Sequence, residues 1–291
     1  MDIELIEVPY DSGHRALRMG AGPAALVDAG LVARLESAGH VVARSRVETD
    51  VEFPTEADVA FDLAARLAER VAAARDRGGL PFVLSGNCMM AAGVVAGLRR
   101  AAGEAGEPDR TPLVVWLDAH GDLNTPETTR SGFLDGMAVS VVLGRCWTTL
   151  AAERLGLRSL PSRALVMLGV RDLDPAEVSE FERGEIRHVA PAGLSDALAD
   201  ARSAAPGEDI YLHIDLDVLD PSVGRANAYA AEGGLTTEQV LSVVDATANH
   251  GHIAAATLSA YDPQDDTSGG ARDAALRIAE RVAARAGGRQ K

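Results

Sequence analysis

The chain has 291 residues and a formal net charge of −15, with 47% hydrophobic and 4% aromatic residues. This length can bury a substantial core, and the acidic balance argues against nucleic acid or an anionic membrane surface as a partner. Two cysteines, Cys88 and Cys146, cannot form a disulfide framework. The acidic start does not resemble a signal peptide, and no apolar stretch reaches the length of a bilayer span. We therefore expect a cytoplasmic protein without a membrane partner.

In the amino-terminal half, short apolar runs predict strands and longer amphipathic runs predict helices. Pro23 stands where the first turn of a helix tolerates proline, which favours a helix through residue 37. The segment 103–112, rich in Gly, Glu and Pro, predicts a loop. Strands are predicted at 2–8, 40–44, 80–84 and from 113, and helices at 20–37, 56–77 and 89–101.

The carboxyl-terminal half continues this alternation, and Thr236 is a plausible amino-terminal helix cap. Strands are predicted at 164–170, 186–189, from 210 and at 252–258, and helices at 137–145, 177–185, 195–203, 237–249 and 273–286. Strand and helix alternate without a linker-like break, which predicts one α/β domain over residues 1–291 with a mostly parallel central sheet between helical layers. Ligands of such sheets bind beyond the carboxyl ends of the strands.

The most informative stretch is residues 113–124, where an apolar run ends in Asp118, His120 and Asp122. In an extended strand end, the i, i+2, i+4 spacing would place all three side chains on one face. Converging carboxylates are hard to hold without a cation, because they repel each other and resist desolvation. A lone Asp-x-His would more simply be a polar turn.

A second cluster shifts the balance towards a metal. Residues 210–221 again lead from an apolar strand into paired carboxylates, Asp215 and Asp217, and His213 shares their strand face. His213 could reach the same site or serve as a hydrogen-bonding residue of the core. Two strand ends that each offer paired Asp residues match the requirement of a dinuclear site for hard metal ions.

Taken together, these motifs resemble the ureohydrolases, the arginase and agmatinase family of dinuclear manganese enzymes. The specific motifs are Asp-Ala-His-x-Asp-x-Asn at 118–124 and Asp-x-Asp-x-x-Asp-Pro at 215–221. Supporting matches lie at 20–23, 131–132, 169–175 and 233–236, so the resemblance covers nearly the whole chain. It implies the arginase-like fold, two Mn²⁺ ions per chain (one is the open alternative) and a homo-oligomer, commonly a trimer or hexamer.

The resemblance also implies a ligand set. One ion would be held by Cys88, Asp118, Asp122 and Asp215, and the other by Asp118, His120, Asp215 and Asp217. Such a pair of ions lowers the pKa of a bridging water, and the resulting hydroxide would attack a planar carbon of a guanidino-type or amide-type small molecule. Asp122 would help to orient this hydroxide and move its proton.

Cys88 departs from the usual family pattern, because Ser85-Gly-Asn-Cys88 stands where Gly-Gly-Asp-His is common. Cysteine is a competent but softer ligand, which could loosen the ion or favour zinc or iron. The alternative is a buried, inert cysteine. The same His-to-Cys change, together with the segment 124–137, resembles the N-hydroxyarginine hydrolase branch of the family.

Further departures fall on the substrate pocket. Ala260 stands where the family places a Glu that pairs with a guanidinium, and a buried cation without a charge partner binds weakly. Asp135, at the position of a proton-shuttling His, or Asp262 could replace that carboxylate, or the substrate could be neutral. Phe133 and Tyr229 replace smaller or polar residues, and Asp174 could read a substrate amine or cap a helix. The remaining substrate candidates are Asn124 and Ser131.

Two hypotheses follow from these residues. The first is a metal-dependent hydrolase of a non-peptide C–N bond in a guanidino, hydroxyguanidino, amidine or ureido compound, with Asp122, Asp135 and His213 as catalytic candidates. The second is a metal-binding protein of the same fold whose catalysis is altered or lost and whose role is binding or regulation. An ordinary arginase is disfavoured by Ala260.

Overall fold

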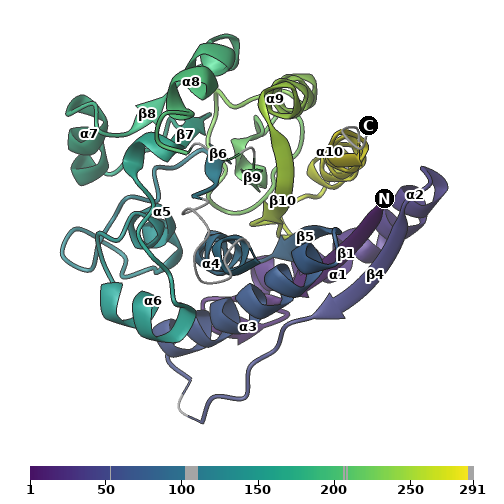
Figure 1. The fold of residues 1–291 in the computed structure, drawn as a ribbon, viewed down its shortest axis with the longest axis horizontal. Helices are drawn as coiled ribbons and strands as arrows, with labels where there is room; N and C mark the ends of the chain where they lie inside the picture. The colour runs from purple at the N-terminus through teal and green to yellow at the C-terminus, as the bar shows by residue number, and fades with distance from the viewer. Residues whose placement is uncertain (53, 102–110, 206, 208, 288–291) are drawn as a thin grey trace.

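The computed structural model describes residues 1–52, 54–101, 111–205, 207 and 209–287. Its centre is an eight-stranded sheet with the order β4-β1-β5-β10-β9-β6-β7-β8, and all of its neighbouring strands are parallel (Figure 1). The strands are β1 Asp2–Val8, β4 Val41–Arg46, β5 Leu80–Ser85, β6 Leu113–Leu117, β7 Leu165–Leu168, β8 Arg187–His188, β9 Asp209–Asp215 and β10 His252–Ser259; β2 Tyr10–Asp11 and β3 His14–Arg15 form a separate hairpin.

Helices cover both faces of this sheet, which confirms the predicted α/β fold of three layers (Figure 1). α3 and α4 pack together on one face, and α8, α9 and α10 lie on the other. The helices are α1 Gly22–Asp28, α2 Leu31–Ser37, α3 Glu56–Asp76, α4 Ala91–Ala101, α5 Ala138–Val142, α6 Thr148–Leu155, α7 Pro175–Glu182, α8 Leu194–Ala201, α9 Thr237–His250 and α10 Gly270–Ala286.

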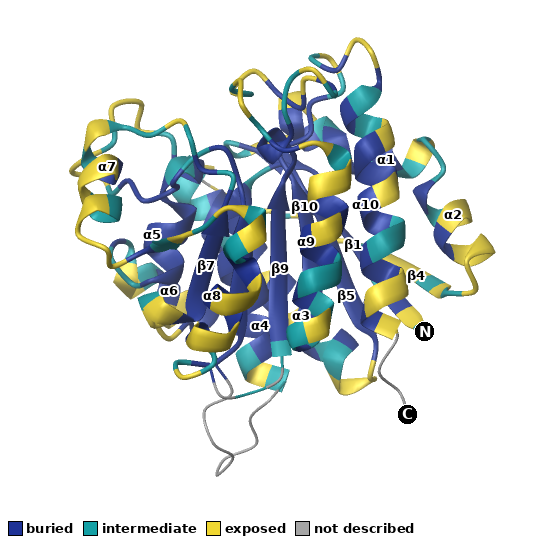
Figure 2. Cartoon of the chain, turned by 90° about the horizontal axis from the view of Figure 1, so that it is seen from above, coloured by how far each residue is buried: buried dark blue, intermediate teal, exposed yellow. Residues whose placement is uncertain are grey.

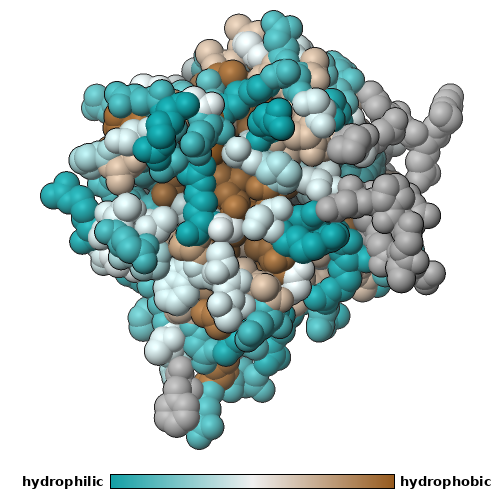
Figure 3. Space-filling model, turned by 60° about the vertical axis from the view of Figure 1, so that its left-hand side comes forward, coloured by the Kyte–Doolittle hydropathy of each residue, from teal (hydrophilic) through white to brown (hydrophobic). Residues whose placement is uncertain are grey.

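The core follows from this layering. Strands β5, β6 and β7 are buried at every position, as expected where helices cover both faces of a parallel sheet. Figure 2 shows these strands as the buried interior, with the exposed residues on the outer sides of the helices. The surface in Figure 3 is mainly hydrophilic, in keeping with the net charge of −15. Among the described residues, no helix has the length and apolar character needed to cross a membrane.

Several predicted boundaries were wrong. The helix expected over 20–37 is divided into α1 and α2, because Gly30 adopts a left-handed conformation with φ of 92°. The helix expected over 137–145 is limited to α5, and α6 was not predicted at all. The cap at Thr236 is confirmed, since its hydroxyl accepts the Gln239 amide hydrogen and Gln239 reciprocates. Most of the loop predicted at 103–112 lies outside the described residues.

The polar motifs meet at one edge of the sheet because parallel strands end on the same side. Strands β5, β10, β9 and β6 are consecutive neighbours, and Cys88, Ala260, Asp215 and Asp118 follow or end them. The expected extended geometry was wrong, however. β6 ends at Leu117, and Asp122 is reached through a left-handed turn with φ of 50°.

Candidate metal centre

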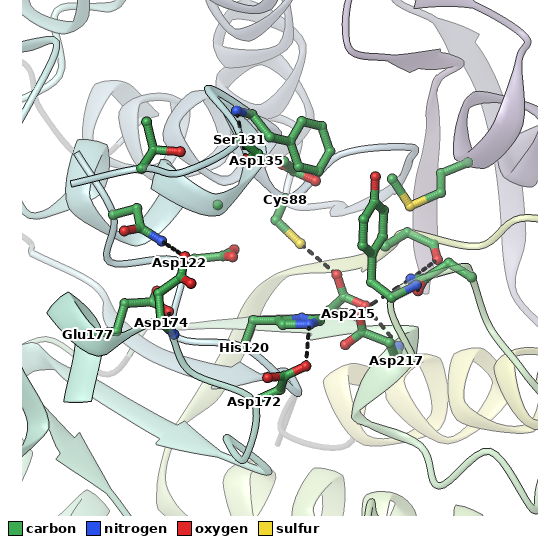
Figure 4. Close-up of a pocket in the computed structure, with 18 residues that line it drawn as sticks. Cys88, His120, Asp122, Ser131, Asp135, Asp172, Asp174, Glu177, Asp215 and Asp217 are labelled. Atoms are coloured by element: carbon green, nitrogen blue, oxygen red, sulfur yellow. Dashed lines mark hydrogen bonds and ion pairs between the residues drawn. The ribbon is translucent and has the colours of Figure 1, made fainter. Parts of the chain in front are cut away.

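Two groups of side chains converge at this edge. Cys88, Asp118 and Asp215 form one cluster, and Asp118, His120 and Asp217 form the other. In each cluster, one ligand atom from every residue lies within 4.8 Å of the others. Asp118 belongs to both clusters, so the two potential ion sites are adjacent. Figure 4 shows the members that line the cavity, with Cys88 turned towards Asp215 and with His120 and Asp217 close to them.

Asp118 is placed by the end of β6. Its two oxygens accept hydrogen bonds from the indole Nε1–H of Trp116 at 3.0 Å and from the His120 amide at 2.7 Å. Burial, followed by the nearby charge of Asp217, raises the pKa of Asp118 above its ordinary value. The ionised form of this carboxyl is therefore costly without a compensating cation.

His120 and Asp217 form a charged pair. His120 Nδ1 lies 3.4 Å from Asp217 Oδ2 and 3.3 Å from Asp118 Oδ1. Burial lowers the pKa of His120, but the charge of Asp217 and hydrogen bonds to both carboxylates outweigh burial and raise it. Burial raises the pKa of Asp217, yet His120 outweighs it and holds the value at about 2. These carboxylates thus favour a positive charge beside them.

Asp122 lies outside both three-residue clusters. Its Oδ2 is buried and has no hydrogen-bond partner among the described residues, and the side chain lines the cavity above the two clusters. Burial and the charge of Asp118 raise its pKa well above the ordinary value. A buried carboxylate oxygen without a partner is destabilising unless a ligand reaches it.

Cys88 opens a 3-10 turn directly after β5 and is buried. Its thiol donates to Asp215 Oδ2 at 2.9 Å, and burial, followed by the charge of Asp215, raises the pKa of the thiol well above its usual range. Burial and the neighbouring Asp217 likewise raise the pKa of Asp215. The sulfur therefore belongs to the cluster with Asp118 and Asp215, and Figure 4 shows it turned towards Asp215.

His213 lies behind this cluster. It is fully buried, stacks on Trp116 with ring centroids 3.8 Å apart, and does not belong to the described residues that line the cavity. Burial lowers its pKa to about 3, so its ring is neutral at ordinary pH. Its Nε2 lies 3.2 Å from Cys88 Sγ.

The cavity above the clusters has a volume of about 240 Å³ and opens to solvent. One of its walls joins Asn124 to Asp174 through an amide-to-carboxylate hydrogen bond of 3.0 Å. Asp174 also caps α7, so both roles proposed for it from the sequence fit its position. Glu177 accepts the amide hydrogens of Leu123 and Asp174, each at 2.9 Å, and thereby ties the ligand loop to α7.

Gly121 permits this last contact. A Cβ at residue 121 would lie 2.8 Å from Glu177 Oε1 and 3.0 Å from Leu173. The glycine within the Asp-Ala-His-Gly-Asp motif is therefore required by close packing of the loop against α7.

The opposite wall carries the residues that depart from the family pattern. Phe133 and Tyr229 stack with ring centroids 5.7 Å apart, and Ser131 lies beside them at the rim. Asp135 accepts hydrogen bonds from the Met89 amide at 2.7 Å and the Asn87 side chain at 2.9 Å. Burial raises the pKa of Asp135 to about 7.

Ala260 also lines the cavity and has a φ of 61°. Asp262, considered above as a replacement carboxylate, is not among the described cavity residues, and its Oδ1 accepts the Gln264 amide hydrogen at 2.9 Å. The structure thus brings the other substrate candidates to one cavity but leaves Asp262 in a neighbouring turn.

Two supporting residues were missed in the sequence. The buried side chain of Asn227 donates to the Ala260 carbonyl at 2.8 Å and lies 3.3 Å from Asp217 Oδ2. Arg171 donates to the carbonyls of Asp217 and Ala231, both at 2.8 Å. Only the motif at 169–175 offered a signal, for Arg171; Asn227 stands in a polar loop without a pattern.

Comparisons with known proteins identify the family of the chain. The model of the family described as "Arginase family" matches residues 1–285. An arginase of Brucella melitensis is 29% identical, over 96% of this chain and 94% of its own. The human mitochondrial arginase-2 is 30% identical, over 91% of this chain and 79% of its own.

Solved structures show the same fold. The arginase of Bacillus cereus superposes with a TM-score of 0.82 at 24% identity, over the full length of both chains. The formimidoylglutamase of Bacillus subtilis superposes with a TM-score of 0.71 at 15% identity, over 98% of this chain and 86% of its own. With a family model that spans nearly all of its sequence, the chain belongs to the arginase family.

Proposed function

We propose that this protein is a metal-dependent hydrolase that cleaves a non-peptide C–N bond in a guanidino, hydroxyguanidino, amidine or ureido compound. The observation that carries the proposal is the pair of ligand clusters that share Asp118, whose other members line an open cavity. Membership of a family of hydrolases supports the reaction class. The position of the clusters, at the carboxyl edge of a parallel sheet, is where such folds bind their ligands.

The residues at the floor fit a pair of divalent ions. Asp122 has a buried oxygen without a partner, and burial together with neighbouring charges raises the pKa of Asp118, Asp122 and Asp215. A bound cation would give the Asp122 oxygen a partner and would lower the pKa values of the three carboxyl groups. The carboxylate-rich donor set favours Mn²⁺, with two ions per chain. When bound, such a pair would make a water molecule acidic enough to act as a nucleophile near neutral pH.

The chain's own residues would divide the remaining work. Cys88, Asp118, Asp122 and Asp215 would hold one ion, and His120 and Asp217 would hold the other with Asp118 and Asp215. Asp122 would also accept a hydrogen bond from the attacking water, since its side chain lines the cavity and its Oδ2 has no partner among the described residues. Asp135 is held by Met89 and Asn87 at the cavity wall, where it would contact the substrate.

Substrate binding would use both walls. Asn124, Ser131 and Asp174 would contact a polar or amino group, and Phe133 with Tyr229 would cover the apolar part of the molecule. Ala260 supplies no charge, and Asp262 does not replace one there. We therefore favour a substrate other than arginine, and the N-hydroxyarginine hydrolase branch is the first alternative within the family.

A second candidate is a metal-binding arginase-fold protein with altered or lost catalysis. Ala260 favours it, because the cavity lacks a carboxylate at that position. His120 and Asp122 both line the cavity and both have strongly raised pKa values, which favours the enzyme.

Metal content and hydrolysis together test the proposal. The purified protein would be analysed for bound metal, reconstituted with Mn²⁺ and incubated with N-hydroxyarginine, arginine and agmatine. We expect two ions per chain and release of hydroxyurea, urea or ammonia from at least one substrate. The Asp217→Asn variant should lose both an ion and the activity. Two bound ions without any turnover over a wider amidine and ureido panel would reject the enzyme and favour the second candidate.

Location and assembly stay predictions. We expect a cytoplasmic protein and a homo-oligomer, either a trimer or a hexamer. Light scattering of the purified protein measures the assembly directly, and a monomeric mass would contradict this expectation.

A further inference from the structure

Behind Cys88 runs a continuous chain of buried hydrogen bonds. His213 Nε2 lies 3.2 Å from the Cys88 sulfur, and His213 Nδ1 lies 2.9 Å from the hydroxyl of Tyr211. That hydroxyl lies 2.8 Å from Thr257 Oγ1 on the neighbouring strand β10. All four side chains are at most 1% exposed, so the protein itself must satisfy their polar atoms.

The direction of these hydrogen bonds follows from the neighbouring groups. The Cys88 thiol donates to Asp215, and the Ser259 hydroxyl can donate either to the Ile214 carbonyl at 3.4 Å or to the Cys88 sulfur at 3.2 Å. Both hydrogens point away from His213 Nε2, which therefore faces two acceptors, the sulfur at 3.2 Å and the Ser259 oxygen at 3.3 Å.

The neutral ring of His213 has a single N–H, and two facing acceptors place it on Nε2. Nδ1 then accepts the hydrogen of the Tyr211 hydroxyl, and the Tyr211 oxygen accepts that of Thr257. Every donor in this series of hydrogen bonds thus points towards the Cys88 sulfur.

The ring of His213 is also fixed in orientation. Trp116, its register partner on β6, stacks on it with an interplanar angle of 23°. The same indole donates its Nε1–H to Asp118 at 3.0 Å. One tryptophan thus holds both the ring that faces Cys88 and a carboxylate of the same cluster.

We propose that His213 is a positioning residue for Cys88, whose Nε2–H keeps the sulfur directed into the Cys88–Asp118–Asp215 cluster as a metal ligand. This inference rests on the part of the proposed function in which Cys88 binds an ion. A hydrogen-bond donor behind a ligand fixes the ligand's direction, and its loss typically weakens metal binding. Tyr211 and Thr257 act one step further away by holding the N–H of His213 on the nitrogen that faces sulfur.

Two substitutions separate the effect of the hydrogen bond from His213 to the sulfur from the effect of the side-chain volume of His213. The side-chain nitrogen of glutamine can take the position of histidine Nε2, whereas asparagine reaches only to the position of Nδ1. His213→Gln therefore keeps a donor for the sulfur, and His213→Asn removes it while a polar side chain remains. Both would be made in a Cys146→Ala background, so that Cys88 is the only thiol of the chain.

Co²⁺ is the probe, because thiolate ligation gives it a charge-transfer absorption in the near ultraviolet. We expect this absorption in the background protein, and an apparent Co²⁺ affinity about 10- to 100-fold weaker in His213→Asn. His213→Gln should retain the absorption and bind within about threefold of the background. Tyr211→Phe, which leaves His213 in place, should cause an intermediate loss.

Several results would overturn the proposal. It fails if the background protein shows no cobalt–sulfur absorption, if His213→Asn binds Co²⁺ as the background does, or if the two His213 variants lose affinity equally. Should both unfold, an unchanged absorption and affinity in Tyr211→Phe would reject it. None of these measurements involves hydrolysis, so failure to turn over any substrate would reject the proposed function and leave this inference standing.

Discussion

Asn227 gives the sharpest test of how Asp217, Tyr229 and Ala260 are held together in the site. Its side-chain nitrogen donates to the Ala260 carbonyl at 2.8 Å and faces Asp217 Oδ2 at 3.3 Å, and its oxygen accepts the Tyr229 amide hydrogen at 2.9 Å. The side chain is 1% exposed, so Asn227→Ala would remove three buried hydrogen bonds. At about 1 kcal/mol for each hydrogen bond, the expected loss is about 3 kcal/mol of unfolding free energy.

Urea denaturation of chelator-treated protein measures this loss without a contribution from bound metal. Asn227→Asp keeps the shape but turns a donor into a charged acceptor opposite Asp217, and it should destabilise at least as much. Gln264→Ala removes an exposed amide and should change the free energy by less than about 0.5 kcal/mol. A loss below about 1 kcal/mol for Asn227→Ala would refute the reasoning.

Three further predictions concern single residues. Burial raises the pKa of Cys146 from 9.0 to about 11, so its contribution to stability is complete below pH 9 and is lost as the pH rises through 11. Alkaline unfolding of wild type should show a loss of about 2 kcal/mol that Cys146→Ala lacks, and parallel curves would contradict this. Arg171 uses Nε, Nη1 and Nη2 to reach the carbonyls of Glu232, Gly169 and Asp217, a fork that lysine cannot reproduce. Arg171→Lys should therefore cost about 2 kcal/mol in denaturant titrations, and an unchanged free energy of unfolding would contradict this. Asp122→Asn removes a buried carboxylate, so it should stabilise the metal-free protein by about 1 kcal/mol. The same substitution should weaken Mn²⁺ binding measured by calorimetry. Tighter binding would exclude Asp122 as a ligand.

The sheet was predictable because its strands correspond to runs of apolar residues in the sequence. The runs at 80–84 and from 113 became β5 and β6, which are buried at every position. The division of the first helix was not predictable from amphipathicity, since it depends on the left-handed conformation of Gly30. α6 was missed because it begins with two threonines, whose helix propensity is low, and tertiary packing outweighs that preference.

The assembly of the site was predictable only in part. The rule that parallel strands end at one edge predicted that the motifs of Asp118 and Asp215 would meet, and the family resemblance added Cys88; the structure brings the three side chains together. The supporting contacts were not accessible, because they join residues far apart in the sequence. Asn227 meets the carbonyl of a residue 33 positions later, and Glu177 meets an amide 54 positions earlier.

His213 shows why the face of a strand is not sufficient to assign a role. Tyr211, His213 and Asp215 alternate along β9 and point to the same side of the sheet. Asp215 ends the strand and lines the cavity. His213 lies two residues earlier in β9, stacks on Trp116 and contacts the sulfur of Cys88, and it is not among the described residues that line the cavity. Distance from the carboxyl edge therefore separates a ligand from the residue that positions a ligand. This distance depends on where β9 stands relative to β6, a register that pairs Trp116 with His213 and that no local pattern specifies.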